Sequence, residues 1–104
     1  MEDKEERPYE VLLTDTAKSS YGQIKSKKDS RRVDKVLNVL DTVPEIGRLY
    51  DPVYDAAKPP FDVRVVYAGR FGIYYRVLED AAQVHIYYIE DQRRDPMERF
   101  SHTD

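Results

Sequence analysis

Three segments in the second half of the chain carry apolar side chains at alternate positions, and they constrain the fold more than any other feature. They cover residues 61–67, 73–77 and 84–88. A period of two is typical of a β-strand with one buried face. Only short turns, at 68–70 and 79–80, separate the segments. Connections this short join antiparallel neighbours, so the sequence predicts a three-stranded antiparallel meander.

The first part of the chain predicts a strand followed by a weak helix. Residues 9–14 (YEVLLT) form a short apolar run bounded by turn formers, as in a buried strand. Residue types that cap helices follow at 14–16, so a helix is expected to begin near Ala17. Two serines and Gly22 are poor helix formers, and this helix is expected to end before Lys27.

A stronger helix is predicted next. Asp29 or Ser30 is expected to cap it. Apolar residues then recur at spacings of three and four, at Val33, Val36, Leu37 and Leu40. The helix is expected to end by Thr42, because Pro44 disfavours continuation. From Pro44 to Pro60 the sequence predicts a long irregular connection.

These elements give the order β-α-α-β-β-β, which defines an α+β fold. Two helices cover only one face of a small antiparallel sheet, so the other face is expected to be open to solvent or to a partner. A chain of 104 residues is expected to form a single domain. We assign that domain to residues 9–100, after a flexible leader at 1–8 and before a tail at 101–104.

The composition excludes several kinds of site. The absence of cysteine rules out a disulfide scaffold, a thiolate metal site and a cysteine nucleophile. The only imidazoles are those of His85 and His102, which argues against a structural zinc site. No apolar stretch approaches the roughly 20 residues that span a bilayer, and the acidic N-terminus lacks the apolar region of a secretory signal. We therefore expect a cytoplasmic protein without membrane contact.

Charge is unevenly distributed along the chain. The net charge is −3, from 17 basic and 20 acidic residues. Residues 16–36 nevertheless hold seven basic residues against two acidic ones, so that their local charge is 7 − 2 = +5. Such a stretch is either a solvated helical face or a phosphate-binding surface. Lys28 and Arg32 are its candidate substrate-binding residues.

The sheet face turned away from the helices is expected to carry the functional side chains. With the apolar positions directed toward the helices, this face displays Asp62, Arg64, Tyr74, Arg76, His85 and Tyr87. Arg93 and Arg94, just past the last strand, extend it. Guanidinium groups bind phosphate, aromatic rings stack on bases and imidazoles transfer protons. Arginine and tyrosine are also ordinary on exposed strands, and a slip of one residue in register would exchange the two faces.

This set of side chains has the chemistry to cleave RNA through its own 2′-hydroxyl. A base must take the 2′-proton, cations must stabilise the phosphorane charge, and an acid must protonate the leaving oxygen. Arginine, tyrosine and histidine supply all three functions without a metal or another cofactor.

Five segments together carry a resemblance to a known family. They are TDTA (14–17), VLNVLDTVPEIG (36–47), VRV (63–65), GRFGIYYRV (69–77) and VHIYYIEDQRRDPMERF (84–100). In this order and spacing they resemble the RelE/ParE superfamily, the toxins of bacterial type II toxin–antitoxin systems. The resemblance covers roughly residues 9–100.

The resemblance implies a fold and a choice of functions. Family members pack helices on one side of a curved antiparallel sheet that the N-terminal strand joins. RelE-like members cut mRNA in the ribosomal A site without a metal, whereas ParE-like members inhibit DNA gyrase, and an antitoxin protein neutralises both. The leading hypothesis is a ribosome-dependent mRNA endonuclease. The alternatives are a gyrase inhibitor and a catalytically degenerate member that only binds a partner.

The resemblance also assigns residues. Arg64 matches a basic residue that contacts phosphate, Arg93 or Arg94 matches the basic position after the last strand, and Phe100 lines up with a terminal aromatic. Gly72 stands where the family commonly has an arginine. We predict catalytic roles for Arg64, Arg76, His85, Tyr87 and Arg94. We predict substrate contacts for Arg70, Tyr74, Arg93, Phe100, Lys28 and Arg32. The expected partners are a cognate antitoxin, and the ribosome with mRNA or, in the alternative, DNA gyrase.

Overall fold

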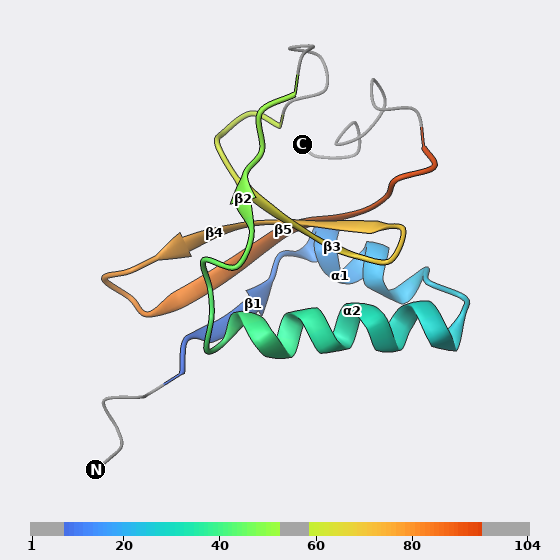
Figure 1. The fold of residues 1–104 in the computed structure, drawn as a ribbon, viewed down its shortest axis with the longest axis horizontal. Helices are drawn as coiled ribbons and strands as arrows, with labels where there is room; N and C mark the ends of the chain where they lie inside the picture. The colour runs from blue at the N-terminus through green and yellow to red at the C-terminus, as the bar shows by residue number, and fades with distance from the viewer. Residues whose placement is uncertain (1–7, 53–58, 95–104) are drawn as a thin grey trace.

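The fold is an open five-stranded sheet with two helices on one side (Figure 1). The computed structural model describes residues 8–52 and 59–94. Along the chain the elements are β1 (Glu10–Leu13), α1 (Asp15–Gly22), α2 (Lys27–Leu40), β2 (Arg48–Leu49), β3 (Arg64–Ala68), β4 (Phe71–Leu78) and β5 (Gln83–Asp91). The predicted α+β fold is confirmed, and the short strand β2 is added within the connection predicted to be irregular.

The strand order is β1-β5-β4-β3-β2. Strands β3, β4 and β5 form the predicted antiparallel meander. Strand β2 adds an antiparallel pair at one edge, and β1 runs parallel to β5 at the other. The sheet is therefore mixed rather than wholly antiparallel. A parallel pair needs a long connection, and the whole chain between β1 and β5 supplies it.

Side-chain caps fix where the two helices begin. The Thr14 hydroxyl accepts a hydrogen bond from the Ala17 amide at 3.2 Å, as the sequence predicts for α1. In α2, Ser26 is the cap, and its hydroxyl accepts from the Asp29 amide at 3.2 Å. The prediction of a cap at Asp29 or Ser30 was wrong. Asp29 is buried inside the first turn, and its carboxylate pairs with Arg70 at 3.2 Å.

A single apolar layer joins the helices to the sheet. Its fully buried members are Ala17, Val33, Leu40, Ile73, Tyr75, Val84 and Ile86. Burying one large apolar side chain stabilises a fold by about 1.5–3 kcal/mol. This layer therefore holds the sheet rigid beneath its opposite face, which is where the functional side chains were predicted.

Strand β3 presents the reverse of its predicted face. Val66 packs with the core beneath the helices, while Val63 and Val65 pack on the other face of the sheet. The register with β4 accounts for this, since Val65 lies opposite Tyr74 and Val66 opposite Ile73. Residues directly opposite one another share a face. Because residues 65 and 66 are both valine, the alternating pattern did not decide between the two faces.

A bulge in β5 reverses the faces a second time. Tyr74 pairs with Tyr88, whereas the next residue, Tyr75, pairs with Ile86, so Tyr87 is an extra residue in the strand. An inserted residue shifts the alternation of everything beyond it. Tyr88 therefore packs away from the helices, and Ile89 packs toward them, contrary to the prediction.

Candidate functional site

The sheet face away from the helices carries a second apolar cluster. Its buried members are Val63, Val65, Tyr74 and Tyr88, flanked by Tyr50, Phe61 and Tyr87. The Tyr50 and Tyr74 rings meet edge to face, with centroids 4.9 Å apart. Tyr74, predicted to bind substrate, is fully buried, and its hydroxyl accepts a hydrogen bond from Gln92 Nε2 at 3.2 Å. Its ring is therefore a packing element of this face.

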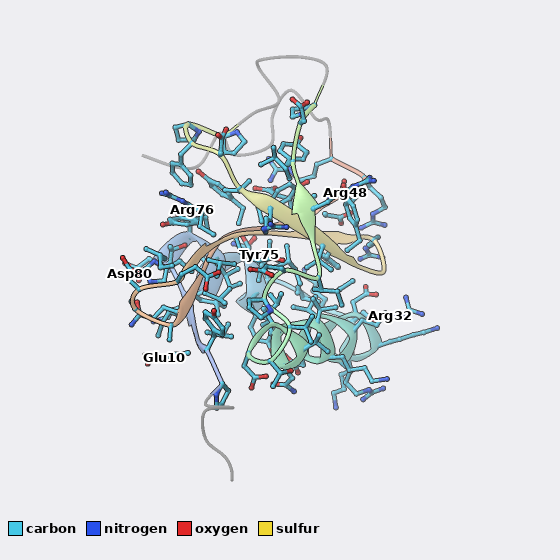
Figure 2. The ribbon with its side chains drawn as sticks, turned by 60° about the vertical axis from the view of Figure 1, so that its left-hand side comes forward. Glu10, Arg32, Arg48, Tyr75, Arg76 and Asp80 are labelled. Carbon is cyan, nitrogen blue, oxygen red and sulfur yellow. The ribbon has the colours of Figure 1, made fainter. Side chains whose placement is uncertain are left out.

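Beside this cluster lies a group of four residues that we call the Arg76 patch: Phe61, Arg76, His85 and Tyr87. The Arg76 guanidinium lies over the Phe61 ring, 5.6 Å from its centroid. The Phe61 and Tyr87 rings meet edge to face at 4.6 Å, and the His85 ring is 6.2 Å from that of Tyr87. Arg76 and His85 are direct cross-strand partners. Figure 2 shows Arg76 on the side of the sheet opposite α2.

The Arg76 patch contains three of the five predicted catalytic residues. Arg76 is exposed, and His85 and Tyr87 are half-buried. The Gln83 Oε1 atom lies 2.9 Å from His85 Nε2. An amide oxygen only accepts, so the neutral ring donates from Nε2 and its Nδ1 remains a proton acceptor. The patch thus joins a cation, an imidazole, a phenol and an aromatic surface.

Arg64 lies on the other side of the sheet, contrary to the prediction. It is directly opposite Tyr75, which belongs to the core under the helices. Its guanidinium Nη1 donates to the Gly47 carbonyl at 2.8 Å. Arg64 and Arg76 nevertheless border one shallow pocket of about 300 Å³ at the end of these strands, which Glu45, Asp62 and Glu79 also line.

Three further predicted arginines gather at the far end of the sheet, and each is paired with a carboxylate. Arg70 lies 3.2 Å from Asp29 and 3.5 Å from Asp91. Arg93 lies 2.9 Å from Asp91, and Arg94 lies 3.1 Å from the buried Glu90. The hydrogen bond from Arg93 lowers the pKa of Asp91 and raises the pKa of Arg93 itself. The paired carboxylates partly neutralise these guanidinium groups, so phosphate contacts made through their remaining N–H groups would be weakened.

This far end is also hollowed. A pocket of about 350 Å³ is lined by both kinds of charge, with Lys25, Arg70, Arg93 and Arg94 against Glu90 and Asp91. The predicted set of functional residues is thus divided between two ends of the molecule.

Two predicted residues on α2 lie away from both groups. Lys28 and Arg32 are exposed on α2, on the helix side of the sheet. Phe100 falls outside the described residues. Gly72, where the family commonly has an arginine, leaves no room for a side chain. A Cβ atom there would lie 2.5 Å from Gln92 Nε2 and 2.9 Å from the Tyr74 ring.

Sequence reasoning missed the place of Phe61 in the site. Its position two residues before Val63 assigned it to the helix side, together with Val63 and Val65. Its ring instead lies under the Arg76 guanidinium and meets the Tyr87 ring edge to face. The same alternation that groups Phe61 with Val63 and Val65 holds in the structure. Only the face assigned to these three residues was wrong.

The element order and the strand order define an open α+β fold, and an arginine–histidine–tyrosine group lies on the sheet face away from its helices. No protein-family model matches the sequence, and no curated protein is similar to it. Two solved structures share the fold. Both are toxin–antitoxin complexes, one archaeal and one mycobacterial.

One is the RelE–RelB complex from Pyrococcus horikoshii OT3, with a TM-score of 0.64 and 16% identity over 85% of this chain and 99% of that chain. The other is the RelBE2 complex from Mycobacterium tuberculosis, with a TM-score of 0.64 and 17% identity over 89% of this chain and 100% of that chain. The resemblance drawn from the sequence is confirmed at the level of the fold. Neither α1 nor α2 has the length and apolar character that crossing a bilayer requires.

Proposed function

We propose that this protein is the toxin of a type II toxin–antitoxin pair and that it cleaves mRNA at the Arg76 patch. The two similar structures, both toxin–antitoxin complexes, support the first part. The single observation that carries the second is the grouping of Arg76, His85 and Tyr87 on adjacent strands. The ribosome is the proposed site of action, as the resemblance to RelE-like toxins implies.

The proposed reaction needs only groups of the RNA and of the patch. His85 takes the proton of the 2′-hydroxyl as that oxygen forms a bond to phosphorus. The bond from phosphorus to the 5′-oxygen breaks, and the Tyr87 hydroxyl returns a proton to that leaving oxygen. The Arg76 guanidinium stabilises the negative charge of the phosphorane. The Phe61 and Tyr87 rings offer a surface on which a base can stack.

Substitution of the patch tests this reaction. The chain would be induced in bacteria, and mRNA 5′ ends would be mapped shortly after growth arrest. Arg76→Ala is expected to reduce cleavage by about 10²–10³-fold, the usual effect of removing one group that stabilises transition-state charge. His85→Ala is expected to reduce it by about 10²–10⁴-fold. Arg48→Ala is the matched control, because Arg48 is also an exposed strand arginine but lies outside the patch.

Ribosome dependence is tested separately with purified protein. Cleavage of a translated mRNA only when ribosomes are present would support this part of the proposal. Equal cleavage of free RNA would contradict ribosome dependence while leaving the patch as the active site.

A second candidate function is binding without catalysis, as in the gyrase inhibitor or the degenerate member considered above. The crowding around Gly72 favours binding without catalysis, since the arginine common in the family has no room at this position. DNA damage signalling with intact mRNA would support gyrase inhibition. Normal growth with the folded protein present would support a protein that only binds a partner.

The proposed antitoxin has an apolar surface to cover. Val43, Ile46 and Leu49 are 48%, 52% and 62% exposed, in the segment from the end of α2 to β2. Neighbouring exposed apolar side chains are typical of protein-binding surfaces. Ile46→Lys is expected to weaken co-purification with the product of a neighbouring small gene, whereas Leu12→Lys, on the opposite edge strand, is the control. Retention of the partner by Ile46→Lys would argue against this surface.

A further inference from the structure

The outward side of α2 carries five basic residues that the Arg76 patch does not use. We call this surface the α2 cationic face; it consists of Lys27, Lys28, Arg31, Arg32 and Lys35. All five are exposed. Their charged groups form no hydrogen bond or ion pair with the rest of the described chain, which covers 8–52 and 59–94.

The acidic residues of α2 do not neutralise this face. Asp29 is 8% exposed and pairs with Arg70 from the turn between β3 and β4. Asp34 accepts a hydrogen bond from the Tyr21 hydroxyl of α1 at 2.6 Å. Both carboxylates are thus occupied within the fold, and the charged side chains on the outward side of the helix are all cationic.

The arrangement of these cations opposes helix stability. Lys27 and Arg31, Arg31 and Lys35, and Lys28 and Arg32 are each four residues apart. Like charges at this spacing face one another on a helix and destabilise it. A rise of 1.5 Å per residue places the row from Lys27 to Lys35 over about 12 Å. The row therefore does not stabilise the helix, and its charge is available to a ligand.

The composition of the face favours a nucleic acid over a protein. Among the described residues, most exposed large hydrophobic side chains lie off α2, at Leu12, Val43, Ile46, Leu49 and Tyr67; Val39, four residues after Lys35, is the one on this helix. Protein interfaces have an apolar core, whereas interfaces with nucleic acid are polar and strongly positive.

The charges elsewhere on the molecule would orient it on a polyanion. Arg32 lies at one end of the molecule in Figure 2, and Glu10 and Asp80 lie at the other. The chain as a whole has a net charge of −3, so a polyanion is attracted only when the α2 cationic face is turned toward it.

We propose that the α2 cationic face binds the phosphodiester backbone of a double-helical nucleic acid without reading its sequence. The face lies across the sheet from the Arg76 patch, so both surfaces can be occupied at once. The proposal does not depend on RNA cleavage.

Fluorescence anisotropy of the full chain with a labelled RNA duplex, and with the DNA duplex of matching sequence, tests this proposal. Replacing one row, in Lys27→Gln/Arg31→Gln/Lys35→Gln, is expected to weaken binding at least tenfold at low salt. Each phosphate contact contributes about 0.9 to the slope of log affinity against log salt concentration, so the slope should become shallower by roughly 2–3. Arg48→Gln, an exposed arginine away from α2, should change neither quantity. The melting temperature of the triple variant should not fall, because the substitutions remove like-charge pairs.

The outcomes separate the possible ligands. Equal binding of both duplexes would support recognition of the backbone alone. Tighter binding of the RNA duplex would support the same backbone contacts and identify RNA as the ligand. Unchanged affinity in the triple variant and in Lys28→Gln/Arg32→Gln would overturn the proposal. Competition by polyglutamate as effective as that of duplex would also overturn it, in favour of an acidic protein. His85→Ala should bind duplex normally, which distinguishes failure of this surface from failure of the proposed reaction.

Discussion

Arg64 and Tyr75 lie directly opposite one another on β3 and β4, and both bind the backbone of Gly47. The Gly47 amide donates to the Tyr75 hydroxyl at 3.0 Å, and Arg64 Nη1 donates to the Gly47 carbonyl at 2.8 Å. A Cβ atom on Gly47 would lie 2.6 Å from the Val65 carbonyl oxygen, so only glycine fits. An arginine that the sequence marked as catalytic thus helps to hold the segment before β2 against the sheet.

Tyr75→Phe should lower the free energy of unfolding by about 1–3 kcal/mol, because it leaves the buried Gly47 amide without an acceptor. Tyr75 is fully buried, and burial raises the pKa of its hydroxyl. Urea denaturation measures the change. Tyr67→Phe is the matched control, since Tyr67 is 45% exposed, and its effect should stay within about 0.5 kcal/mol. Equal effects of the two substitutions would show that the contact with Gly47 is unimportant.

Arg64→Ala should also destabilise the fold, by about 1.5–3 kcal/mol, the usual range for a hydrogen bond from a charged donor. This expectation replaces the prediction from sequence that Arg64 acts directly on phosphate. Activity should therefore fall only as far as folding does. The measurement pairs urea denaturation with mRNA cleavage at a temperature where the variant remains folded. A stable but inactive Arg64→Ala protein would restore Arg64 to the catalytic group.

The elements that the sequence predicted well are those with strong local patterns. The meander follows from alternation between short turns, and α2 follows from apolar residues at spacings of three and four. The resemblance of five segments to RelE-like proteins gave the correct fold because it depended on their order. None of these inferences required knowing which side of a strand faces the core.

The candidate site was less predictable because it depends on the face. Adjacent valines at 65 and 66 left the orientation of β3 undecided, and the extra residue Tyr87 reversed the alternation in the second half of β5. His85, which precedes the bulge in β5, and its cross-strand partner Arg76 lie on the predicted face. The ion pair of Arg70 with Asp29 could not be predicted either, since the two residues are distant in the sequence.

Gly72→Ala should cost about 1–3 kcal/mol of stability, the usual range for overpacking. The new methyl group would meet Gln92 and the Tyr74 ring, and the ring is fixed among buried side chains. Gly22→Ala is the control, because no atom lies within 4 Å of a Cβ there. It should be neutral or stabilising by about 0.4–1 kcal/mol. Thermal unfolding of both variants measures the difference.

The same crowding bears on restoring the missing arginine. Gly72→Arg should destabilise at least as much as Gly72→Ala and should not create a nuclease. A stable Gly72→Arg protein with increased mRNA cleavage would contradict this expectation and would favour a degenerate active site.

Asp91 should make stability depend on pH in the acid range. Its pKa is lowered chiefly by the hydrogen bond from Arg93, so the folded state holds its proton less tightly than the unfolded state does. The resulting stabilisation is complete above the unfolded pKa, about 3.9 for aspartate, and is lost as the pH falls through the lower folded value. Asp91→Asn removes this dependence but keeps a side chain of the same size. The difference in unfolding free energy between wild type and Asp91→Asn should therefore be constant from neutral pH to about pH 5 and shrink below about pH 4. Urea denaturation across this range measures it, and a difference that stays constant down to about pH 2 would show that the pairing with Arg93 does not lower the pKa of Asp91.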